Sequence, residues 1–318
     1  MSVIQSLKQA AQADLKTIVL PEGNDPRVVQ AAEMLADEKL VRPILLNGVT
    51  DHSGVTVINT LDSTYRPELA TLFHDLRKHK GISLEDAETA INAPLTFGAL
   101  MVRHGLADGC VAGAVHATRD VLRAALQIVG LEEGNNLASS VFLMILPDGR
   151  AITYGDCGMV PDPDADQLAN IAVTSAGTHT QLTGQTPKVA MLSFSTKGSA
   201  DSDSVQKVRS ATALAQELAP SMQIDGELQF DAAYVPAVGE RKAAGSDVAG
   251  HANVFIFPNL DAGNIGYKIT ERIGGAQAIG PLLQGFAKPI HDLSRGSSAE
   301  DIMMAAVVAA VQAKSSSQ

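Results

Sequence analysis

Short apolar runs alternate along the chain with longer stretches in which apolar residues recur every three or four positions. The short runs predict buried strands, and the longer stretches predict amphipathic helices. Strands that alternate with helices in this way are typical of a parallel sheet covered by helices. In the first 130 residues we expect strands at 17–20, 42–46, 55–58 and 109–115, and helices at 26–40, 66–79, 83–104 and 118–129.

The pattern changes near the middle of the chain. Two apolar runs, 140–146 and 151–154, are separated only by Pro147-Asp-Gly149, which predicts a hairpin. Alternation then resumes, and from Lys288 a loop leads into an expected helix at 299–313. We therefore expect two α/β domains, one formed by residues 1–142 with 288–318 and the other by residues 143–287. The elements expected in the second domain are helices 164–182, 204–218 and 263–273 and strands 189–193 and 253–257.

The composition agrees with two globular domains. The chain has 318 residues, of which 45% are hydrophobic and 19% charged, a balance typical of folded proteins. Aromatic residues make up 4% and there is no tryptophan, so the core has to be built from Ala, Val, Leu and Ile. Aliphatic cores of this kind suit parallel sheets that are covered on both faces.

Charge and cysteine content exclude several classes of protein. A net charge of −11 argues against nucleic-acid binding, which needs a basic face. The two cysteines are too few for a disulfide framework. No apolar run approaches the roughly 20 residues of a membrane span, and the N-terminus lacks the pattern of a cleaved leader. We expect a cytoplasmic protein in which a few arginines attract any anionic substrate against an unfavourable overall charge.

The segment from Asp292 to Ile302 is the strongest candidate for chemistry. It places one arginine, Arg295, among small residues just before an expected helix. Free backbone N–H groups, the helix dipole and a guanidinium group together favour an anion. The spacing of Ser298 and Asp301 has a second interpretation, because it also matches an ordinary capping box.

Several long stretches occur in an order that resembles the phosphate acetyltransferase (phosphotransacetylase) family. The resemblance extends over nearly the whole chain, and Asp108-Gly109, Gly113 and Leu122-Arg123 belong to it as well. The long stretches are Asp292-Leu-Ser-Arg-Gly296, Ala190–Ser199, Asp225–Ala233, Asn253–Pro258 and Leu76–Gly81.

This resemblance implies a two-domain α/β/α fold with largely parallel sheets, like that of isocitrate and isopropylmalate dehydrogenases, with the active site in the interdomain cleft. It implies a homodimer that interconverts acetyl-CoA and inorganic phosphate with acetyl phosphate and coenzyme A. Coenzyme A is then a substrate, and no bound cofactor and no metal are expected.

The resemblance also implies roles for the residues of the C-terminal loop. Asp301 matches the position proposed as the base that takes the proton of the coenzyme A thiol, whose pKa is ordinarily about 8.5. An ordinary aspartate has a pKa of about 3.9, so partial burial would have to raise it. Arg295 would orient phosphate, and Ser294 would donate a hydrogen bond to the developing oxyanion. Ser297, expected to contact substrate, stands where some relatives carry cysteine, which fits direct transfer without an acetyl-enzyme.

Further substrate contacts are expected outside this loop. Arg77 and Arg123 match family arginines near the substrate, although Arg77 also fits a solvated basic helix end. Residues 193–199 follow a strand and precede a helix, so Ser195, Thr196 and Lys197 are candidates for an anion-cradling loop that lacks P-loop spacing. Asn264 and Tyr267 are expected to face the substrate, with helix capping as the alternative for Asn264.

Three other functions remain open from the sequence. A phosphate butyryltransferase would differ only in the volume of its pocket. A metal- and NAD(P)-dependent dehydrogenase of the same fold would need an aspartate cluster, and the only dense acidic group, Asp162, Asp164 and Asp166, resembles a helix N-terminus. A non-catalytic acyl-CoA sensor would bind coenzyme A without needing both a base and an arginine.

Overall fold

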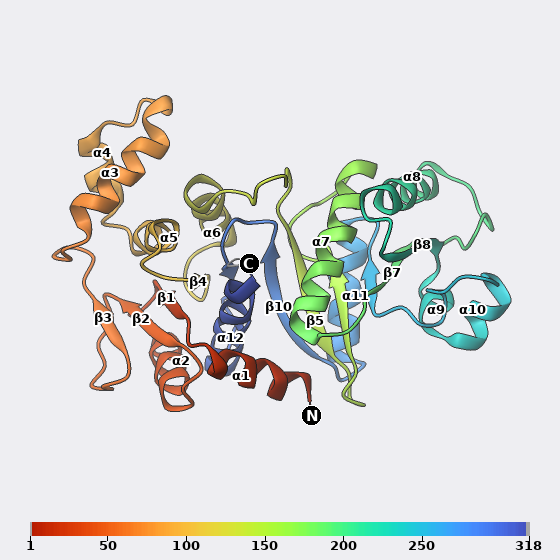
Figure 1. Ribbon diagram of the computed structural model, residues 1–318, viewed down its shortest axis with the longest axis horizontal. Coiled ribbons are helices and arrows are strands. Elements are labelled where there is room, and N and C mark those ends of the chain that lie inside the picture. Colours follow the sequence, from red (N-terminus) through yellow and green to blue (C-terminus); the bar gives the residue numbers. More distant parts are fainter. Residues whose placement is uncertain (1, 316–318) are drawn as a thin grey trace. The chain divides into compact units, whose positions relative to one another are not determined.

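The computed structural model describes residues 2–315, which form two compact units (Figure 1). The first unit contains residues up to Asn135 and from Phe286 onward, and the second contains Asn136–Gly285. An expected boundary after residue 142 would fall inside strand β5 (Ser139–Ile145), which lies wholly in the second unit.

The first unit is built on a five-stranded sheet in the described residues, with strand order β11-β4-β1-β2-β3 and every pairing parallel. Its strands are β1 (Thr17–Leu20), β2 (Arg42–Leu46), β3 (Thr56–Ile58), β4 (Gly109–Ala112) and β11 (Ile290–Asp292). Its helices are α1 (Val3–Ala13), α2 (Pro26–Asp37), α3 (Arg66–Arg77), α4 (Leu84–Ala90), α5 (Pro94–His104), α6 (Thr118–Ala124) and α12 (Ala299–Ser315), with a 3-10 turn at Lys78–Lys80 and a π-helical turn at Ala125–Val129.

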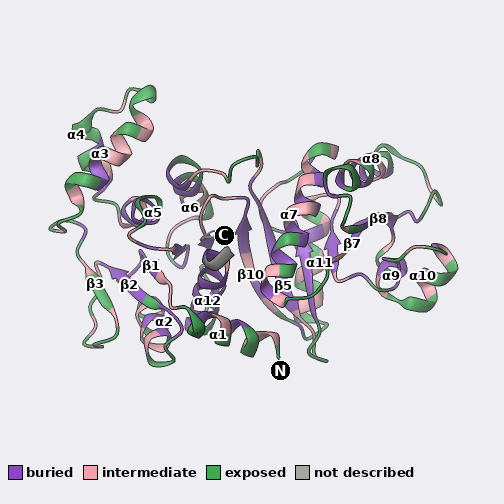
Figure 2. Cartoon of the chain, in the orientation of Figure 1, coloured by how far each residue is buried: buried purple, intermediate pink, exposed green. Residues whose placement is uncertain are grey.

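Helices cover both faces of this sheet, as a buried parallel sheet requires. Val19 of β1 packs in one core cluster with Phe97 and Leu100 of α5. On the opposite face, the side chains of Ile18 and of Ala309 in α12 both approach Gly109. Figure 2 shows the sheet and α12 as largely buried, because α12 is apolar on nearly all sides and packs against β4, α2 and α1.

The second unit contains a six-stranded sheet in the described residues, ordered β10-β5-β6-β9-β7-β8. The pairings from β6 to β8 are parallel, whereas β5 and β10 are antiparallel to their neighbours. The prediction of an α/β fold with two largely parallel sheets is confirmed. Its strands are β5, β6 (Ala151–Gly155), β7 (Lys188–Leu192), β8 (Gln223–Leu228), β9 (Val254–Ile256) and β10 (Gln277–Gln284), and its helices are α7 (Ala165–Thr183), α8 (Asp203–Leu218), α9 (Phe230–Tyr234), α10 (Pro236–Lys242) and α11 (Leu260–Arg272).

Local chemistry explains where the predicted elements were right and where they were wrong. The hairpin is confirmed, since Ile145 pairs with Ala151 across the predicted turn. The single helix predicted at 83–104 is wrong, because Pro94 begins a second helix after α4 has ended. The strand predicted at 109–115 ends at Ala112, since Gly113 turns the chain with a φ of +108°.

Candidate active site

The first candidate region lies beyond the carboxyl ends of β1, β4 and β11 in the first unit. Because these strands are parallel neighbours, the segments that follow them gather along one edge of the sheet. The chain runs from β1 outward through β2 and β3 on one side, while β4 lies on the other side of β1. Ligands of α/β proteins bind preferentially at such a reversal of strand order.

Glu22, which lies just after β1, binds the segment that follows β4. Its side chain is buried and accepts backbone N–H hydrogen bonds from all four residues of Gly113–His116, at 2.7–3.1 Å. The Nδ1 atom of His116 lies 2.7 Å from the same carboxylate. Burial would raise the pKa of Glu22, but the hydrogen bonds from the His116 ring and the backbone lower it overall. An ionised carboxylate of the chain itself therefore fills this nest of N–H groups.

Arg27 connects the segments that follow three strands. Its Nη1 donates to the carbonyl oxygens of Arg295 at 2.9 Å and Ser297 at 2.8 Å, and its Nη2 donates to that of Ala114 at 3.0 Å. An ion pair with Asp25, the N-cap of α2, holds the guanidinium in place. Arg27 was not singled out from the sequence. Its opposite charge to Asp25, on the other side of the proline that starts α2, could have indicated an ion pair.

The C-terminal loop has a fixed backbone and exposed side chains. Ser294 and Arg295 are exposed, while Ser297 is buried and its N–H donates to the Ser294 carbonyl at 2.9 Å. The Arg295 guanidinium makes no hydrogen bond or ion pair within residues 2–315. Among the described residues, the Ser294 hydroxyl accepts only the Gly296 N–H, at 3.2 Å. Both side chains remain available for a ligand.

Asp301 caps helix α12. The Ser298 N–H donates to the Asp301 carboxylate at 2.9 Å, and the Asp301 N–H donates to the Ser298 hydroxyl at 3.2 Å. This is the capping box that the sequence offered as the alternative interpretation. The Asp301 side chain is exposed, so the partial burial that the sequence analysis required for a base is not present around it.

A second carboxylate in the same motif is buried. Asp292, the last residue of β11, is 3% exposed, and its Oδ1 is the buried carboxylate oxygen without a partner in the described residues. Burial and the nearby charge of Glu22 raise the pKa of Asp292 to about 6, against a hydrogen bond from Thr118 that lowers it. A Cβ at position 113 would stand 2.5 Å from Oδ1, so this arrangement requires the glycine present there.

The two other arginines predicted for substrate lie on helices of the same unit. Arg77 is the last residue of α3 and is half-buried. Arg123 lies on α6, with a side chain 63% exposed, and pairs with Asp120 at 2.8 Å.

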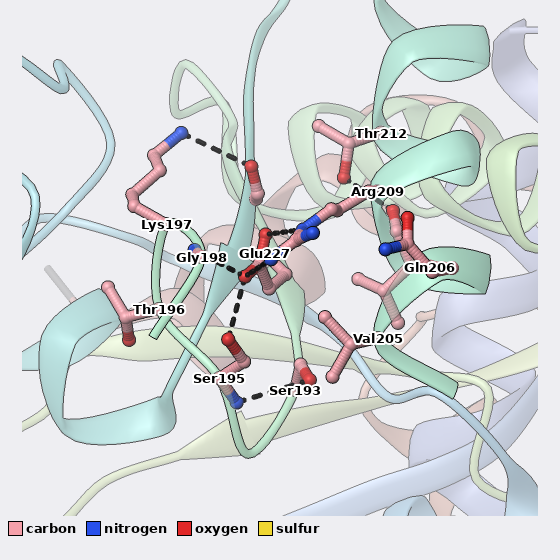
Figure 3. A network of polar contacts seen from close by, with 12 residues as sticks. Ser193, Ser195, Thr196, Lys197, Gly198, Val205, Gln206, Arg209, Thr212 and Glu227 are labelled. Carbon is pink, nitrogen blue, oxygen red and sulfur yellow. Dashed lines mark hydrogen bonds and ion pairs between the residues drawn. The ribbon is translucent and has the colours of Figure 1, made fainter. Parts of the chain in front are cut away.

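In the second unit the loop Ser193–Ser199 surrounds a carboxylate of the chain itself, as Figure 3 shows. Glu227 of β8 is 2% exposed and accepts from the Ser195 hydroxyl at 2.8 Å and the Gly198 N–H at 2.9 Å. The Arg209 guanidinium donates to both carboxylate oxygens at 3.0 and 3.1 Å. Burial opposes ionisation, but Arg209, Gly198 and Ser195 lower the pKa of Glu227 to about 2. The loop that was predicted to surround an anion therefore surrounds the Glu227 carboxylate of the chain itself.

The other two candidates of this loop are also engaged within the unit. Thr196 accepts the Gln229 N–H at 2.9 Å. Lys197, at a φ of +47°, forms an ion pair with Asp225 and donates to the Gly226 carbonyl at 3.2 Å. These contacts fix the loop against β8.

Asn264 and Tyr267 join α11 to neighbouring strands. The Asn264 amide donates to the Cys157 carbonyl at 3.1 Å. The Tyr267 ring stacks on Phe142 of β5, with ring centres 4.0 Å apart. Both contacts are structural, and both side chains are only partly buried.

The acidic group considered for a metal site starts a helix. Asp164 is the N-cap of α7, Asp166 lies in its first turn, and Asp162 pairs with Lys207 at 2.6 Å. Within residues 2–315 no three His, Cys, Asp or Glu side chains come together in a group that could hold a metal ion. No helix of that range is long and apolar enough to cross a membrane.

The chain is similar to known proteins over nearly its whole length. A family model described as phosphate acetyl/butaryl transferase matches residues 2–310. A phosphate acetyltransferase of Acetivibrio thermocellus is 47% identical over 328 aligned positions, which cover 99% of both chains. The solved EutD phosphotransacetylase of Staphylococcus aureus is 45% identical, with a TM-score of 0.92 and 98% of each chain covered. A branched-chain phosphotransacylase of Enterococcus faecalis is 19% identical, with a TM-score of 0.73 over 94% of this chain and 99% of that one, and shares the fold.

Proposed function

The chain belongs to the phosphate acetyl/butaryl transferase family of acyltransferases, and on this premise we propose that it transfers acetyl between coenzyme A and inorganic phosphate. The observation that carries the proposal is the loop after β11. Arg27 holds its backbone at the carbonyls of Arg295 and Ser297, while the side chains of Ser294 and Arg295 stay exposed. A fixed backbone with free donors suits a phosphate and a developing oxyanion.

The proposed reaction is a direct transfer. Asp301 is exposed in the chain itself, so in this mechanism it is the bound substrate that shields it from water. Asp301 takes the proton of the coenzyme A thiol, and the thiolate forms a bond to the acetyl carbon of acetyl phosphate. The Ser294 hydroxyl donates to the carbonyl oxygen as negative charge develops on it. The carbonyl then re-forms, the carbon–oxygen bond to phosphate breaks, and Arg295 holds the departing phosphate. In the reverse direction phosphate attacks acetyl-CoA and the thiolate leaves.

The exchange Asp301→Asn tests this mechanism. Asparagine keeps an oxygen for the Ser298 cap but cannot take a proton, so kcat should fall at least about a hundredfold, the usual scale of acid–base catalysis, with little change in KM. Ser298→Ala is the control, because it removes the hydroxyl half of the capping box and leaves the Asp301 carboxylate in place. The assay is arsenate- or phosphate-dependent breakdown of acetyl-CoA. Equal loss in both variants would make Asp301 a capping residue only.

Arg77 and Arg123 are proposed to attract the anionic substrates. Lysine at either position keeps the charge but loses the planar fork of donors. A several-fold higher KM for coenzyme A or phosphate, with unchanged kcat, is the expected result of either lysine exchange. An unaltered KM would leave Arg123 with its Asp120 pair as a structural contact.

We propose acetyl as the acyl group and the cytoplasm as the compartment. The relatives that are 45–48% identical over nearly full length carry the acetyl name, which favours acetyl over butyryl. Comparison of kcat/KM for acetyl-CoA and butyryl-CoA tests the choice. Higher kcat/KM with butyryl-CoA would reverse it.

A homodimer is proposed on a surface of α11. Ile265, Ile269 and Ile273 repeat every four residues and are 57%, 53% and 83% exposed, which forms an apolar ridge. In an antiparallel pair of α11 helices, Asp261 at one end lies beside Arg272 of the partner subunit. Ile269→Asp should give a monomer in light scattering. Asp261→Arg should weaken the dimer, and adding Arg272→Asp should restore it.

A further inference from the structure

His116 and Glu22 form a histidine–carboxylate pair at the sheet edge that carries the Ser294–Arg295 loop. The Nδ1 atom of His116 lies 2.7 Å from Glu22 Oε1, and the backbone N–H of His116 donates to the same oxygen at 2.7 Å. Glu22 is ionised at neutral pH and can only accept, so Nδ1 carries a hydrogen and donates it. The proton that the ring gains or loses is therefore the one on Nε2.

The Nε2 atom of His116 is left for a ligand. It makes no hydrogen bond or ion pair within residues 2–315, and the side chain is 31% exposed. The hydrogen bond to Glu22 raises the pKa of His116 against the effect of burial, and the charges of Glu22 and of Asp120 on α6 raise it further. An imidazole that a carboxylate orients through one nitrogen can act as an acid or a base through the other.

The charged groups near this pair come from several elements. Asp120 is paired with Arg123 on the same helix at 2.8 Å. Asp292 ends β11, and burial and the charge of Glu22 raise its pKa to about 6. Arg27 of α2 is the cation near Glu22, and it is paired with Asp25. Since each of these arginines already has an acidic partner, the negative charge of Glu22 remains to favour the protonated form of His116.

The backbone brings His116 close to the Ser294–Arg295 loop. Strands β4 and β11 are parallel neighbours, so the segments that follow them leave the sheet side by side. One guanidinium, that of Arg27, donates to the Ala114 carbonyl at 3.0 Å and to the Arg295 carbonyl at 2.9 Å. His116 is two residues from the first carbonyl, and Ser294 adjoins the second. A phosphate held by Arg295 therefore lies at the edge that also carries the His116 ring.

The proposed transfer needs an acid as well as a base. Acetyl phosphate is a dianion at neutral pH, so cleavage of its bond to the acetyl carbon would release the phosphate trianion, a base too strong to form at this pH. The departing oxygen has to receive a proton as the bond breaks. Arg295 does not give up a proton at any working pH, and Asp301 takes one in this direction. Neither residue can supply the proton that phosphate needs.

We propose that His116 is a further catalytic residue, whose Nε2 atom donates a proton to the phosphate oxygen as its bond to the acetyl carbon breaks. The electron pair of that bond stays on the oxygen, and phosphate leaves as hydrogen phosphate. His116 is then neutral, with its Nδ1–H still bound to Glu22. Asp301 releases the thiol proton to water, and His116 regains a proton from water before the next turnover.

The reverse reaction uses the same atoms. Neutral His116 takes the proton of hydrogen phosphate through Nε2 while the phosphate oxygen forms its bond to the carbonyl carbon of acetyl-CoA. The proposal rests on the proposed function, since it adds one proton transfer to that reaction. It predicts opposite pH dependence in the two directions, because one needs the protonated ring and the other the neutral ring.

His116→Asn tests the proposal. Its amide keeps a donor for Glu22 but has no nitrogen that titrates, so kcat for acetyl-CoA formation should fall about a hundredfold at pH 6.5. In the unaltered protein this kcat should decline as the pH rises through the raised pKa of His116, and kcat for acetyl phosphate formation should increase over the same range. Both trends should be absent in the variant.

His52→Gln is the matched control. His52 is also a partly buried histidine paired with a carboxylate, Asp37, at 2.9 Å through Nε2. Asp37 is the last residue of α2, at the end opposite to Arg27, so this pair lies away from the candidate site. The exchange should leave kcat and its pH dependence as they are in the unaltered protein.

Two results would overturn the proposal. One is a kcat of His116→Asn equal to that of the unaltered protein. The other is a lower kcat that keeps the same pH dependence in both directions, because His116 would then support the loop without moving a proton. Failure of the proposed function is distinguishable, since the unaltered protein itself would then transfer no acetyl between coenzyme A and phosphate.

Discussion

Glu22 in the first unit and Glu227 in the second each hold a loop in place, but they bind different side chains. Each is a buried carboxylate that accepts backbone N–H groups of a loop following a strand. Glu227 is balanced by Arg209, whose charge is permanent, and its pKa is lowered to about 2. Glu22 has His116 as its side-chain partner, and the hydrogen bond to Glu22 raises the pKa of that histidine. The loop in the second unit is therefore held at any working pH, and the loop beside the candidate active site is held by a contact that titrates.

The largest expected effect comes from removing the permanent partner. Arg209→Ala leaves Glu227 buried without a cation, which typically costs about 3–5 kcal/mol of unfolding free energy. Urea unfolding measures it. Lys207→Ala, on the same helix, breaks a surface pair with Asp162 and should cost less than about 1 kcal/mol. Similar losses in the two variants would mean that the Glu227 pair is worth no more than a surface contact.

Acid should destabilise both units through one buried histidine each. Burial lowers the pKa of His179 and of His291 to about 4. The unfolded chain takes up these protons near pH 6.5 but the native protein does so only near pH 4. Stability should therefore be constant above about pH 6.5 and fall between pH 6.5 and 4, by up to about 3 kcal/mol per histidine. In His179→Gln the acid dependence should become shallower, and an unaltered slope between pH 7 and 5 would contradict this assignment.

The titrating contact of the first unit should show the opposite pH dependence. His116→Ala removes one charge-assisted hydrogen bond, worth about 1.5 kcal/mol, while Glu22 keeps its four backbone partners. Because the pKa of His116 is raised in the native state, its contribution is complete below about pH 6.5. It should be lost as the pH rises through the raised value. Unfolding of both proteins at pH 6 and pH 9 checks the sign, and a difference that grows with pH would refute it.

The smallest expected effect concerns the cap of α12. Ser298→Ala removes one side of the capping box and should cost about 1 kcal/mol, the usual worth of an N-cap. The change is measured as a shift of the urea midpoint. A loss above about 3 kcal/mol would indicate that Ser298 supports more than the helix end.

The sequence predicted those parts of the fold that depend on local pattern. Strand β1, with its buried run, and the loop from Asp292 into α12 follow from neighbouring residues. Strand β8, Gln223–Leu228, was not predicted, because its carboxylates interrupt the apolar pattern. Glu227 is tolerated there only because Arg209, on another helix, neutralises it.

The site was predictable to a similar degree. Ser294 and Arg295 were placed in a loop before a helix, and the structure has them there, with exposed side chains. Glu22 was not singled out from the sequence, since its partners lie more than ninety positions away. The anion cradle at 193–199 was correctly located as a loop, but the carboxylate that fills it comes from β8. Contacts between distant segments leave no trace in the local pattern of one sequence.

Strand β11 and helix α12 also fix an order of assembly. The first unit is discontinuous, and β11 joins β4 only after the whole of Asn136–Gly285 has been synthesised. Until then, β4 is an open edge on the growing chain, and the apolar surface that α12 later covers is bare. Arg27 meanwhile has no Arg295 or Ser297 carbonyl to bind. The loop between β11 and α12 therefore takes its place only after the second unit has been synthesised.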